Sequence, residues 1–302
     1  MNAFFPDAAP TLVVPDIRSS AMLVDASVSC WSGNRLDREA TEDITINSGA
    51  ASGVARVRKS LMGDNANLRD VHKAANALRT THRMKTLPWG ESSTRLLVTA
   101  SHTEYVEVMS KLQDEFVQAA ETFLHEESYW ADVEQARIDL GSMFDPADYP
   151  HPDQLRQRFG VTLTFMPIPD SADFRLDINE QAMERMRRSY EEHYQNAVQG
   201  ASKAVWERVR SALEKLAHAT EVPEDGSKRR IRESTFDGAV ELVGFLRDWN
   251  LEGSTQMSAI ADKLEATFQG VDRKDLKDYP EVRDEVRTDI TSVLATLPSL
   301  DM

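Results

Sequence analysis

Residues 81–97, THRMKTLPWGESSTRLL, gather two arginines, a lysine, a histidine and a tryptophan around a Pro-Trp-Gly turn. This combination suits the binding of a single-stranded nucleic acid. Such a strand needs cations along its phosphates and an aromatic face on which a base can stack. Trp89 can supply that face, and Trp31 is a second candidate. The cations would come from Arg79, Arg83, Lys85 and Arg95.

The basic character extends upstream, over residues 54–97. This segment holds nine basic and three acidic residues, a net charge of +6, within a chain whose net charge is −15. Residues 101–160 hold thirteen acidic and four basic residues. Because phosphate contacts come from Lys and Arg, the pattern predicts a basic groove. The predicted nucleic-acid-binding residues are Arg56, Arg58, Lys59, Arg79, Arg83, Lys85, Trp89 and Arg95.

The same residues also have a purely structural interpretation. Trp89 can anchor a turn in the core, and the basic side chains can pair with the acidic helix that starts at Ser101. His72 and His82 are expected to be solvated partners of their helix rather than titrating catalysts. This interpretation predicts that each cation faces a carboxylate instead of an open groove.

Motifs for catalysis are missing from the sequence. It contains no GxxxxGK[ST] phosphate loop, no GxGxxG, no HExxH and no GxSxG. A hard cation could be gathered by Asp145, Asp148, His151 and Asp153, but short acidic residues more often cap helices and fill proline-rich turns. We therefore predict no catalytic residues, no metal site and no cofactor, and an enzyme is the least favoured class.

The spacing of apolar residues predicts the helices and strands that would position the basic segment. Residues 23–31 alternate as a half-buried strand, and residues 44–53 are small and polar, which predicts a loop. Residues 67–85 have the spacing of an amphipathic helix that Pro88 ends, and residues 96–98 form a short apolar run. A long helix is expected from Ser101. Residues 144–153 hold three prolines and predict a loop.

The second half of the chain adds a hairpin and a long helix. Residues 161–169 and 173–178 alternate around a turn at 170–172, which predicts a β-hairpin beside the strand at 23–31. One apolar stripe over residues 179–220 predicts a helix long enough to pack against another chain, so we expect a homo-oligomer. Three shorter helices should start near Ser234, Ser254 and Pro280.

These elements predict a predominantly helical α+β fold in which a small antiparallel sheet packs against long helices. We expect a mixed α+β domain over residues 1–180 and a helical region over residues 181–302. A single cysteine excludes an internal disulfide, and the sequence shows neither a signal peptide nor a membrane span. We therefore expect a cytoplasmic protein that does not bind membranes.

Five strings resemble an uncharacterised family of bacteriophage proteins. The strings are HRMKTLPWGESSTRLL (82–97), EYVEVM (104–109), LGSMFDPADYPHPDQLRQRF (140–159), DFRLDI (173–178) and AVWERV (204–209). The resemblance covers roughly residues 23–216. It implies a large, soluble protein encoded by a tailed phage, often among genes of DNA metabolism, and hence located in the host cytoplasm. It brings no catalytic residues.

Two functions therefore compete. The first is a nucleic-acid-binding accessory protein, with single-stranded DNA as its partner in replication or recombination. The second is a non-catalytic oligomeric assembly or interaction protein, whose acidic surface binds a basic partner or mimics DNA. Spatial arrangement separates them, because cations pointing into one open groove favour DNA, and cations that each face a carboxylate favour assembly.

Overall fold

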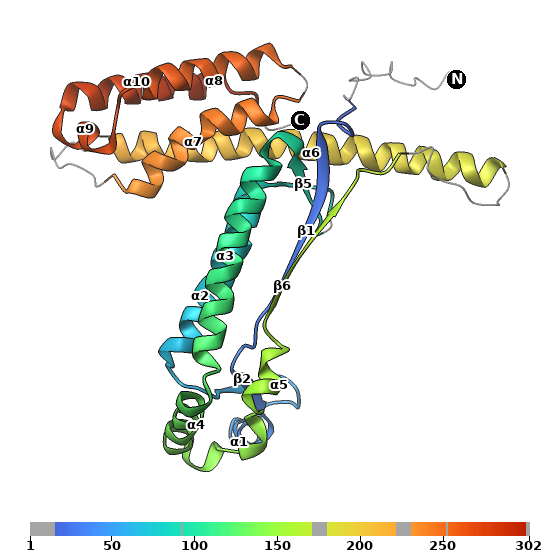
Figure 1. Cartoon of the computed structure of the whole chain (residues 1–302), viewed down its shortest axis with the longest axis vertical. Helices are drawn as coiled ribbons and strands as arrows, with labels where there is room; N and C mark the ends of the chain where they lie inside the picture. The colour runs from blue at the N-terminus through green and yellow to red at the C-terminus, as the bar shows by residue number, and fades with distance from the viewer. Residues whose placement is uncertain (1–15, 92, 171–179, 222–230, 252, 300–302) are drawn as a thin grey trace. The chain divides into compact units, whose positions relative to one another are not determined.

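The computed structural model describes residues 16–91, 93–170, 180–221, 231–251 and 253–299 (Figure 1). Its chain forms two compact units. Unit 1 comprises residues 1–24, 86–102 and 165–302, and unit 2 comprises residues 25–85 and 103–164. The chain passes between the units four times. The predicted boundary at residue 180 does not match this division, because residues 86–102 and 165–180 lie in one unit with the helices that follow.

A four-stranded sheet runs in the order β4-β5-β1-β6. Its strands are β1 (Ala21–Ser29), β4 (Leu87–Pro88), β5 (Arg95–Val98) and β6 (Gly160–Met166). Within unit 1, β1 pairs antiparallel with β5, with Ala21 opposite Val98 and Val24 opposite Arg95. The strands predicted at 23–31 and 161–169 are confirmed as neighbours, although β1 and β6 end earlier, at Ser29 and Met166. The predicted second hairpin strand, 173–178, lies outside the described residues.

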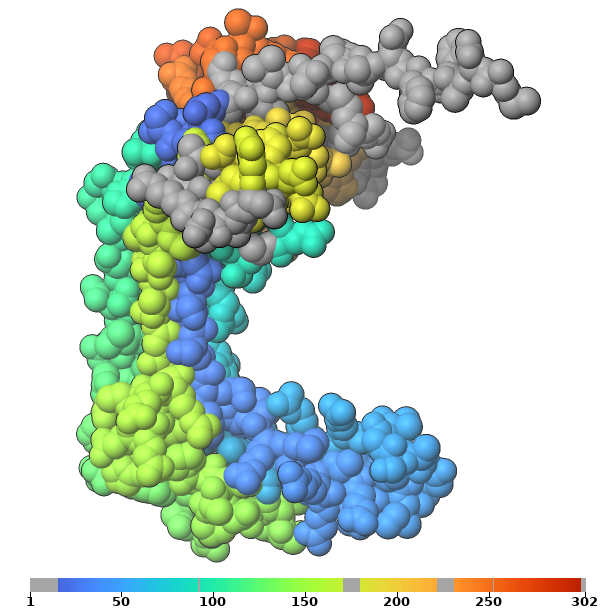
Figure 2. Space-filling view, turned by 90° about the vertical axis from the view of Figure 1, so that its right-hand side faces the viewer, coloured from blue at the N-terminus to red at the C-terminus, as the bar shows by residue number. Residues whose placement is uncertain are grey.

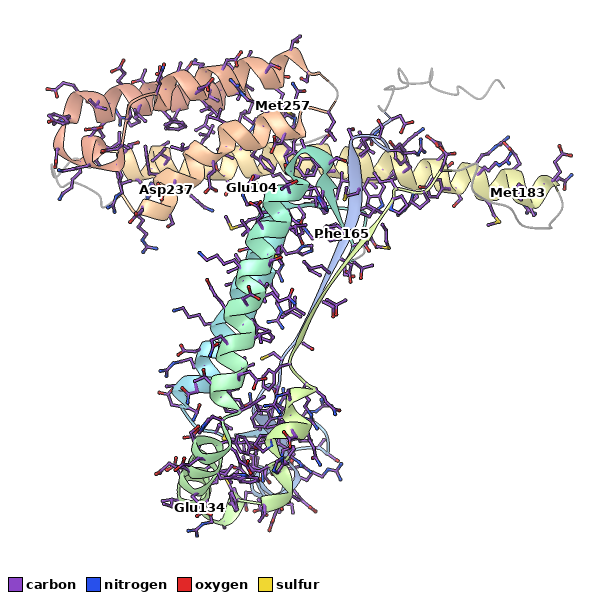
Figure 3. All side chains as sticks on the ribbon, in the orientation of Figure 1. Glu104, Glu134, Phe165, Met183, Asp237 and Met257 are labelled. Atoms are coloured by element: carbon purple, nitrogen blue, oxygen red, sulfur yellow. The ribbon has the colours of Figure 1, made fainter. Side chains whose placement is uncertain are left out.

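Unit 1 is completed by five helices, α6 (Glu180–Thr220), α7 (Glu233–Trp249), α8 (Thr255–Phe268), α9 (Arg273–Asp278) and α10 (Pro280–Thr296). The long helix and the starts of the three shorter ones are confirmed; α9 was not predicted. Spacing of three and four residues brings Val205, Val209, Leu213 and Leu216 onto one buried face of α6, against α7 and α10. Figure 3 labels Met257 of α8, which is buried, and Asp237 of α7, which is exposed.

Buried polar contacts fix the ends of these helices. The guanidinium of Arg283, whose residue is 3% exposed, donates to the carbonyl oxygens of Ala219 and Thr220 at the end of α6. These carbonyls have no partner within the helix, so the contact satisfies them and places a positive charge at the negative end of the helix dipole. Asp272 and Asp275 form a capping box at the start of α9.

Unit 2 contains a two-stranded ribbon and four complete helices. It also contains α3 from its second residue onward. The ribbon strands are β2 (Asn34–Asp37) and β3 (Val57–Ser60), and the helices are α1 (Arg38–Asn47), α2 (Ala66–Lys85), α4 (Glu126–Leu140) and α5 (Pro152–Arg156); α3 spans His102–Phe123. Helix α2 buries Leu68, Val71, Ala75 and Leu78, as its spacing predicts. Trp31 stacks on Phe123, with ring centroids 5.9 Å apart, so its ring serves the core of this unit.

One loop predicted in unit 2 is wrong in part, and a second is largely confirmed. The loop predicted at 44–53 overlaps α1, which continues to Asn47. Thr41 and Thr45 disfavour a helix, but their hydroxyls donate to the carbonyls of Asp37 and Thr41, and the Asp37 carboxylate accepts from the Ala40 amide as an N-cap. The loop predicted at 144–153 is largely irregular, as expected; it contains one 3-10 turn at Pro146–Asp148 and ends in the first residues of α5.

The described fold is the predicted one in class: predominantly helical α+β with a small antiparallel sheet. No helix in the described ranges is both long and apolar enough to span a lipid bilayer.

Candidate interaction surface

The eight predicted binding residues are divided between the two units. Trp89 and Arg95 belong to unit 1, and the other six belong to unit 2. Their surroundings differ greatly, so each must be judged by its own exposure and contacts.

Trp89 is a core residue. It is 6% exposed, and its ring makes an edge contact with Tyr194 of α6, with centroids 5.9 Å apart. Gly90 has φ of +61°, and a Cβ there would lie 3.1 Å from the His193 ring, so this turn favours glycine. The burial of this ring favours the structural interpretation of Trp89 over base stacking.

Arg95 is used inside unit 1. Its guanidinium donates to the Thr86 hydroxyl at 2.6 Å and to the Thr86 carbonyl at 3.0 Å. Arg208 of α6 donates to the same carbonyl at 3.0 Å. Burial, followed by the charge of Arg95, lowers the pKa of Arg208 to about 10. Arg95 thus binds β5 to the start of β4.

Lys59 is the most deeply paired of the predicted cations. Its side chain is 8% exposed, its ammonium lies 2.9 Å from the Asp148 carboxylate and 3.6 Å from Asp37, and it donates to the Met143 carbonyl at 2.6 Å. Burial opposes its charge, but the hydrogen bond and charge of Asp148, with those of Asp37, raise its pKa. These contacts favour the structural interpretation of Lys59 over a phosphate contact.

The acidic loop residues have structural roles. Asp148 also pairs with Arg35 at 2.5 Å. Asp145 accepts from the Ala147 amide as a cap, and His151 accepts from the Asp153 amide. The described residues contain no group of three His, Cys, Asp or Glu side chains that could hold a metal ion. The caps formed by Asp145 and His151 agree with the alternative in which such residues cap helices and fill proline-rich turns, and the ion pairs of Asp148 are a further structural role.

Along α2 the cations have mixed roles. Lys85 pairs with Glu104 of α3 at 2.5 Å, as the structural interpretation predicted, and Arg79 donates to the Val28 carbonyl at 2.8 Å. Arg83 is exposed. His82 corrects another expectation: it is 6% exposed and bonds to the Tyr105 hydroxyl at 2.8 Å, so it is not solvated.

Arg58 of β3 and Arg56, one residue before that strand, are both exposed. Strands β2 and β3 are antiparallel, and Arg35 lies opposite Lys59 on the face of the ribbon that also carries Asp37. Leu36 lies opposite Arg58 on the other face. Neither Arg56 nor Arg58 forms an ion pair with any residue that the structure describes. Alternation therefore separates a neutralised inner face from an outer face that combines leucine with free guanidinium groups.

Residues 34–60, which we call the α1 arm, combine this ribbon with α1. Helix α1 has no fully buried residue. Four aliphatic side chains of the arm are well exposed: Leu36 (44%), Ile44 (46%), Ile46 (69%) and Val54 (75%). In Figure 2 the blue atoms at the lower right, which include this arm, extend away from the green helices of the same unit. Exposed aliphatic residues gathered on one protruding segment are typical of an interaction surface.

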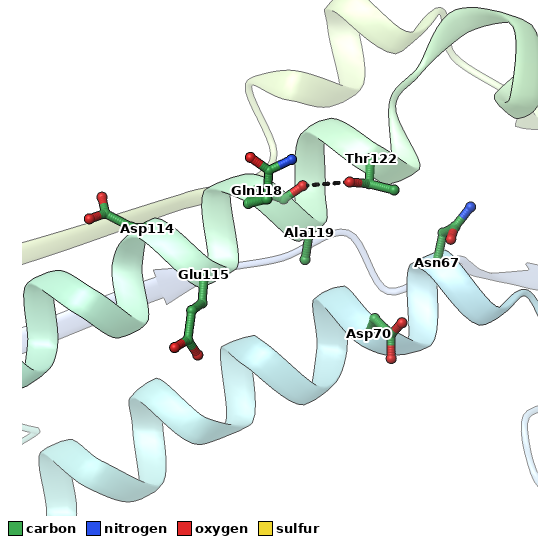
Figure 4. A pocket seen from close by; sticks show the side chains of 7 residues that line it. All are labelled: Asn67, Asp70, Asp114, Glu115, Gln118, Ala119 and Thr122. Carbon is green, nitrogen blue, oxygen red and sulfur yellow. Dashed lines mark hydrogen bonds between the residues drawn. The ribbon is translucent and has the colours of Figure 1, made fainter.

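A groove between α2 and α3 is acidic, unlike the α1 arm with its exposed aliphatic and arginine side chains (Figure 4). Its volume is about 530 Å³. Seven residues line it: Asn67, Asp70, Asp114, Glu115, Gln118, Ala119 and Thr122. Thr122 donates to the Gln118 backbone carbonyl at 2.9 Å. Three carboxylates in one groove would repel the phosphates of a nucleic acid.

Comparisons with protein-family models, with curated proteins and with solved structures find no match to this chain. The α1 arm therefore has to be interpreted from its own residues. Sequence patterns missed it because its Ile-Thr-Ile run (44–46) suggested neither a helix nor a buried strand. The usable signal was Asp37 at the N-cap position, followed by charges spaced four residues apart.

Proposed function

We propose that this chain is a non-catalytic assembly protein that associates with further copies of itself. One observation carries the proposal: the α1 arm exposes four aliphatic side chains on a segment whose helix buries nothing completely. Aliphatic and arginine side chains together are the composition of protein interfaces, where an apolar centre is surrounded by polar groups.

The contacts of the predicted cations support assembly over a nucleic-acid groove. Lys59 and Lys85 face carboxylates, whereas Arg79 and Arg95 donate to backbone carbonyl groups of the same chain. Cations that are already bound contribute little to phosphate recognition, because a new contact would have to replace an existing one.

The sequence suggested that the apolar stripe of the long helix would make the oligomer contact, but the structure points to a different surface. Most of the apolar stripe of α6, from Tyr194 to Leu216, is buried within unit 1. The long helix therefore uses that part of its apolar face for its own core. The surface that supports association is the α1 arm.

Nucleic-acid binding in phage DNA metabolism is a second proposal. Arg56 and Arg58 favour it, since both are exposed and free of ion pairs with the described residues.

Light scattering tests the first proposal. We expect the purified chain at micromolar concentration to show a mass above that of the 34.0 kDa monomer. A monomer mass over the whole micromolar range would contradict assembly. Fluorescence polarisation with a labelled oligonucleotide, at two salt concentrations, tests the second. Micromolar binding that weakens steeply with salt would favour the nucleic-acid proposal.

A further inference from the structure

The α1 arm lacks the burial that normally stabilises a short helix. A helix of fewer than about 12–15 residues is marginal in water unless tertiary packing supports it. Only the inner face of α1 is in contact with the ribbon, where the Val57 amide donates to the Thr41 hydroxyl at 3.0 Å. Arg38, Glu42 and Ile46, spaced four residues apart, share another face and are all exposed. A partner on that face would supply the missing burial.

The charges of the arm identify the kind of partner. Apart from Arg35, whose guanidinium binds Asp148, the arm exposes three cations and three anions, so their charges cancel. The cations are Arg38, Arg56 and Arg58, and the anions are Glu39, Glu42 and Asp43. None of these six forms an ion pair with a residue in the described ranges. A nucleic acid would be attracted by one set and repelled by the other.

A second arm offers both charges at once. In a two-fold contact the same patch meets itself, so a residue that contacts another across the axis is contacted in return. Each arginine group then faces the carboxylates of the partner, and the aliphatic side chains between them become buried. Such an interface leaves the acidic surfaces elsewhere on the chain in solvent, where they keep other faces from associating.

We infer that two copies of this chain pair through their α1 arms, in a two-fold contact that buries Ile46 and matches arginines with carboxylates. This inference rests on the proposed assembly function and names its interface.

Ile46→Asp and Ile138→Asp form a matched pair of variants. The two isoleucines are 69% and 67% exposed, and Ile138 lies on α4 of the same unit. Both variants should fold, because neither residue is buried. Sedimentation equilibrium should show a dimer dissociation constant raised at least about tenfold by Ile46→Asp, a loss of 1.4 kcal/mol or more, and unchanged by Ile138→Asp. Circular dichroism melts of the two variants check that the fold is kept.

Charge reversal gives a sharper test. One variant carries Arg56→Glu and Arg58→Glu, and the other carries Glu39→Lys and Glu42→Lys. Each alone should be monomeric, because its arm then carries four excess charges of one sign and repels its copy. Mixed in equal amounts, the two should form a mixed dimer whose affinity falls with salt.

The outcomes separate the two proposals. A monomeric wild type overturns the assembly function and this interface together. A wild-type dimer that survives both Ile46→Asp and the charge reversals overturns this interface and leaves assembly in place through another surface. Charge-reversed variants that fail to pair on mixing, while each alone is monomeric, overturn the two-fold match of arginines with carboxylates.

Discussion

At the scale of single residues, Trp89 changes from a predicted ligand contact to a structural anchor. Trp89→Ala should lower the free energy of unfolding of unit 1 by about 3–5 kcal/mol, because truncating a buried tryptophan loses its packing and leaves a cavity. Urea denaturation followed by circular dichroism measures the change. Trp130→Ala, at a site 38% exposed, is the control and should cost much less. Equal effects at the two sites would contradict the buried position of Trp89.

The buried pair of Lys59 and Asp148 makes a second residue-scale prediction. Asp148→Ala should destabilise unit 2 by about 3–5 kcal/mol, because it leaves the ammonium of Lys59 buried beside the weaker contact with Asp37. Combining it with Lys59→Met should recover part of that loss, since no buried charge then remains. Denaturant titrations of the two single variants and the double variant form a mutant cycle. Strictly additive losses would show that the pair is not coupled.

Tyr149 gives a prediction for alkaline pH. Its hydroxyl donates to the Leu61 carbonyl at 2.8 Å, and burial, followed by the charge of Asp148, raises its pKa from 10.0 to about 12. Because folding raises the pKa of Tyr149, the neutral phenol stabilises the folded state. This stabilisation is complete below about pH 10 and is lost as the pH rises towards 12. That contribution is about 2–3 kcal/mol.

Tyr149→Phe should therefore make the free energy of unfolding fall less steeply above about pH 10 than it does in the wild type. Urea titrations at several alkaline pH values measure the slope. Tyr279→Phe, at a tyrosine that is 56% exposed, serves as the comparison. If the Tyr149→Phe slope equals that of the wild type, the buried phenol is not the titrating group.

The residue scale is also where sequence reasoning was weakest. Residue types showed that Lys85 could pair with an acidic helix, and Glu104 does accept it. They could not show that Lys59 is buried, because its partner Asp148 lies far along the chain in a loop that had looked irregular. Exposure of an individual cation depends on such distant contacts and leaves no local pattern.

At the scale of elements, periodicity predicted α2, α6 and the strands β1 and β6 because each carries an apolar face of its own. Helix α1 has no such face and was missed. Its existence depends on Asp37, whose side chain accepts from the Ala40 amide at 2.9 Å. Asp37→Ala should cost about 1 kcal/mol through the lost cap, plus the loss of the contact with Lys59.

Asp37→Asn separates these two contributions. Asparagine caps helices about as well as aspartate but carries no charge. Hydrogen exchange of the α1 amides should therefore be faster in Asp37→Ala and close to wild type in Asp37→Asn. Equally fast exchange in both variants would assign the stability of α1 to the charge of Asp37 rather than to its cap.

At the scale of the whole molecule, the division into units follows from contacts that sequence does not reveal. Leu87, Leu96 and Val98 of the sheet share one core with Val205 and Val209 of α6. A fragment of residues 1–180 should therefore expose this apolar sheet face and bind a hydrophobic dye more strongly than the full chain. A soluble fragment without increased dye binding would contradict the shared core.

Because the segments of the two units alternate along the chain, one unit is fully translated before the other. All of unit 2 lies before residue 165, so its segments are complete while α6 to α10 have still to be translated. Unit 1 combines the first residues of β1 (21–24) with α10, so its segments are complete only after α10 has been translated. Because domains tend to fold as units during translation, the unit that carries the α1 arm can fold on the ribosome first. The sheet can pair early, because all four of its strands precede α6, but its apolar residues in unit 1 stay uncovered until α6 to α10 emerge.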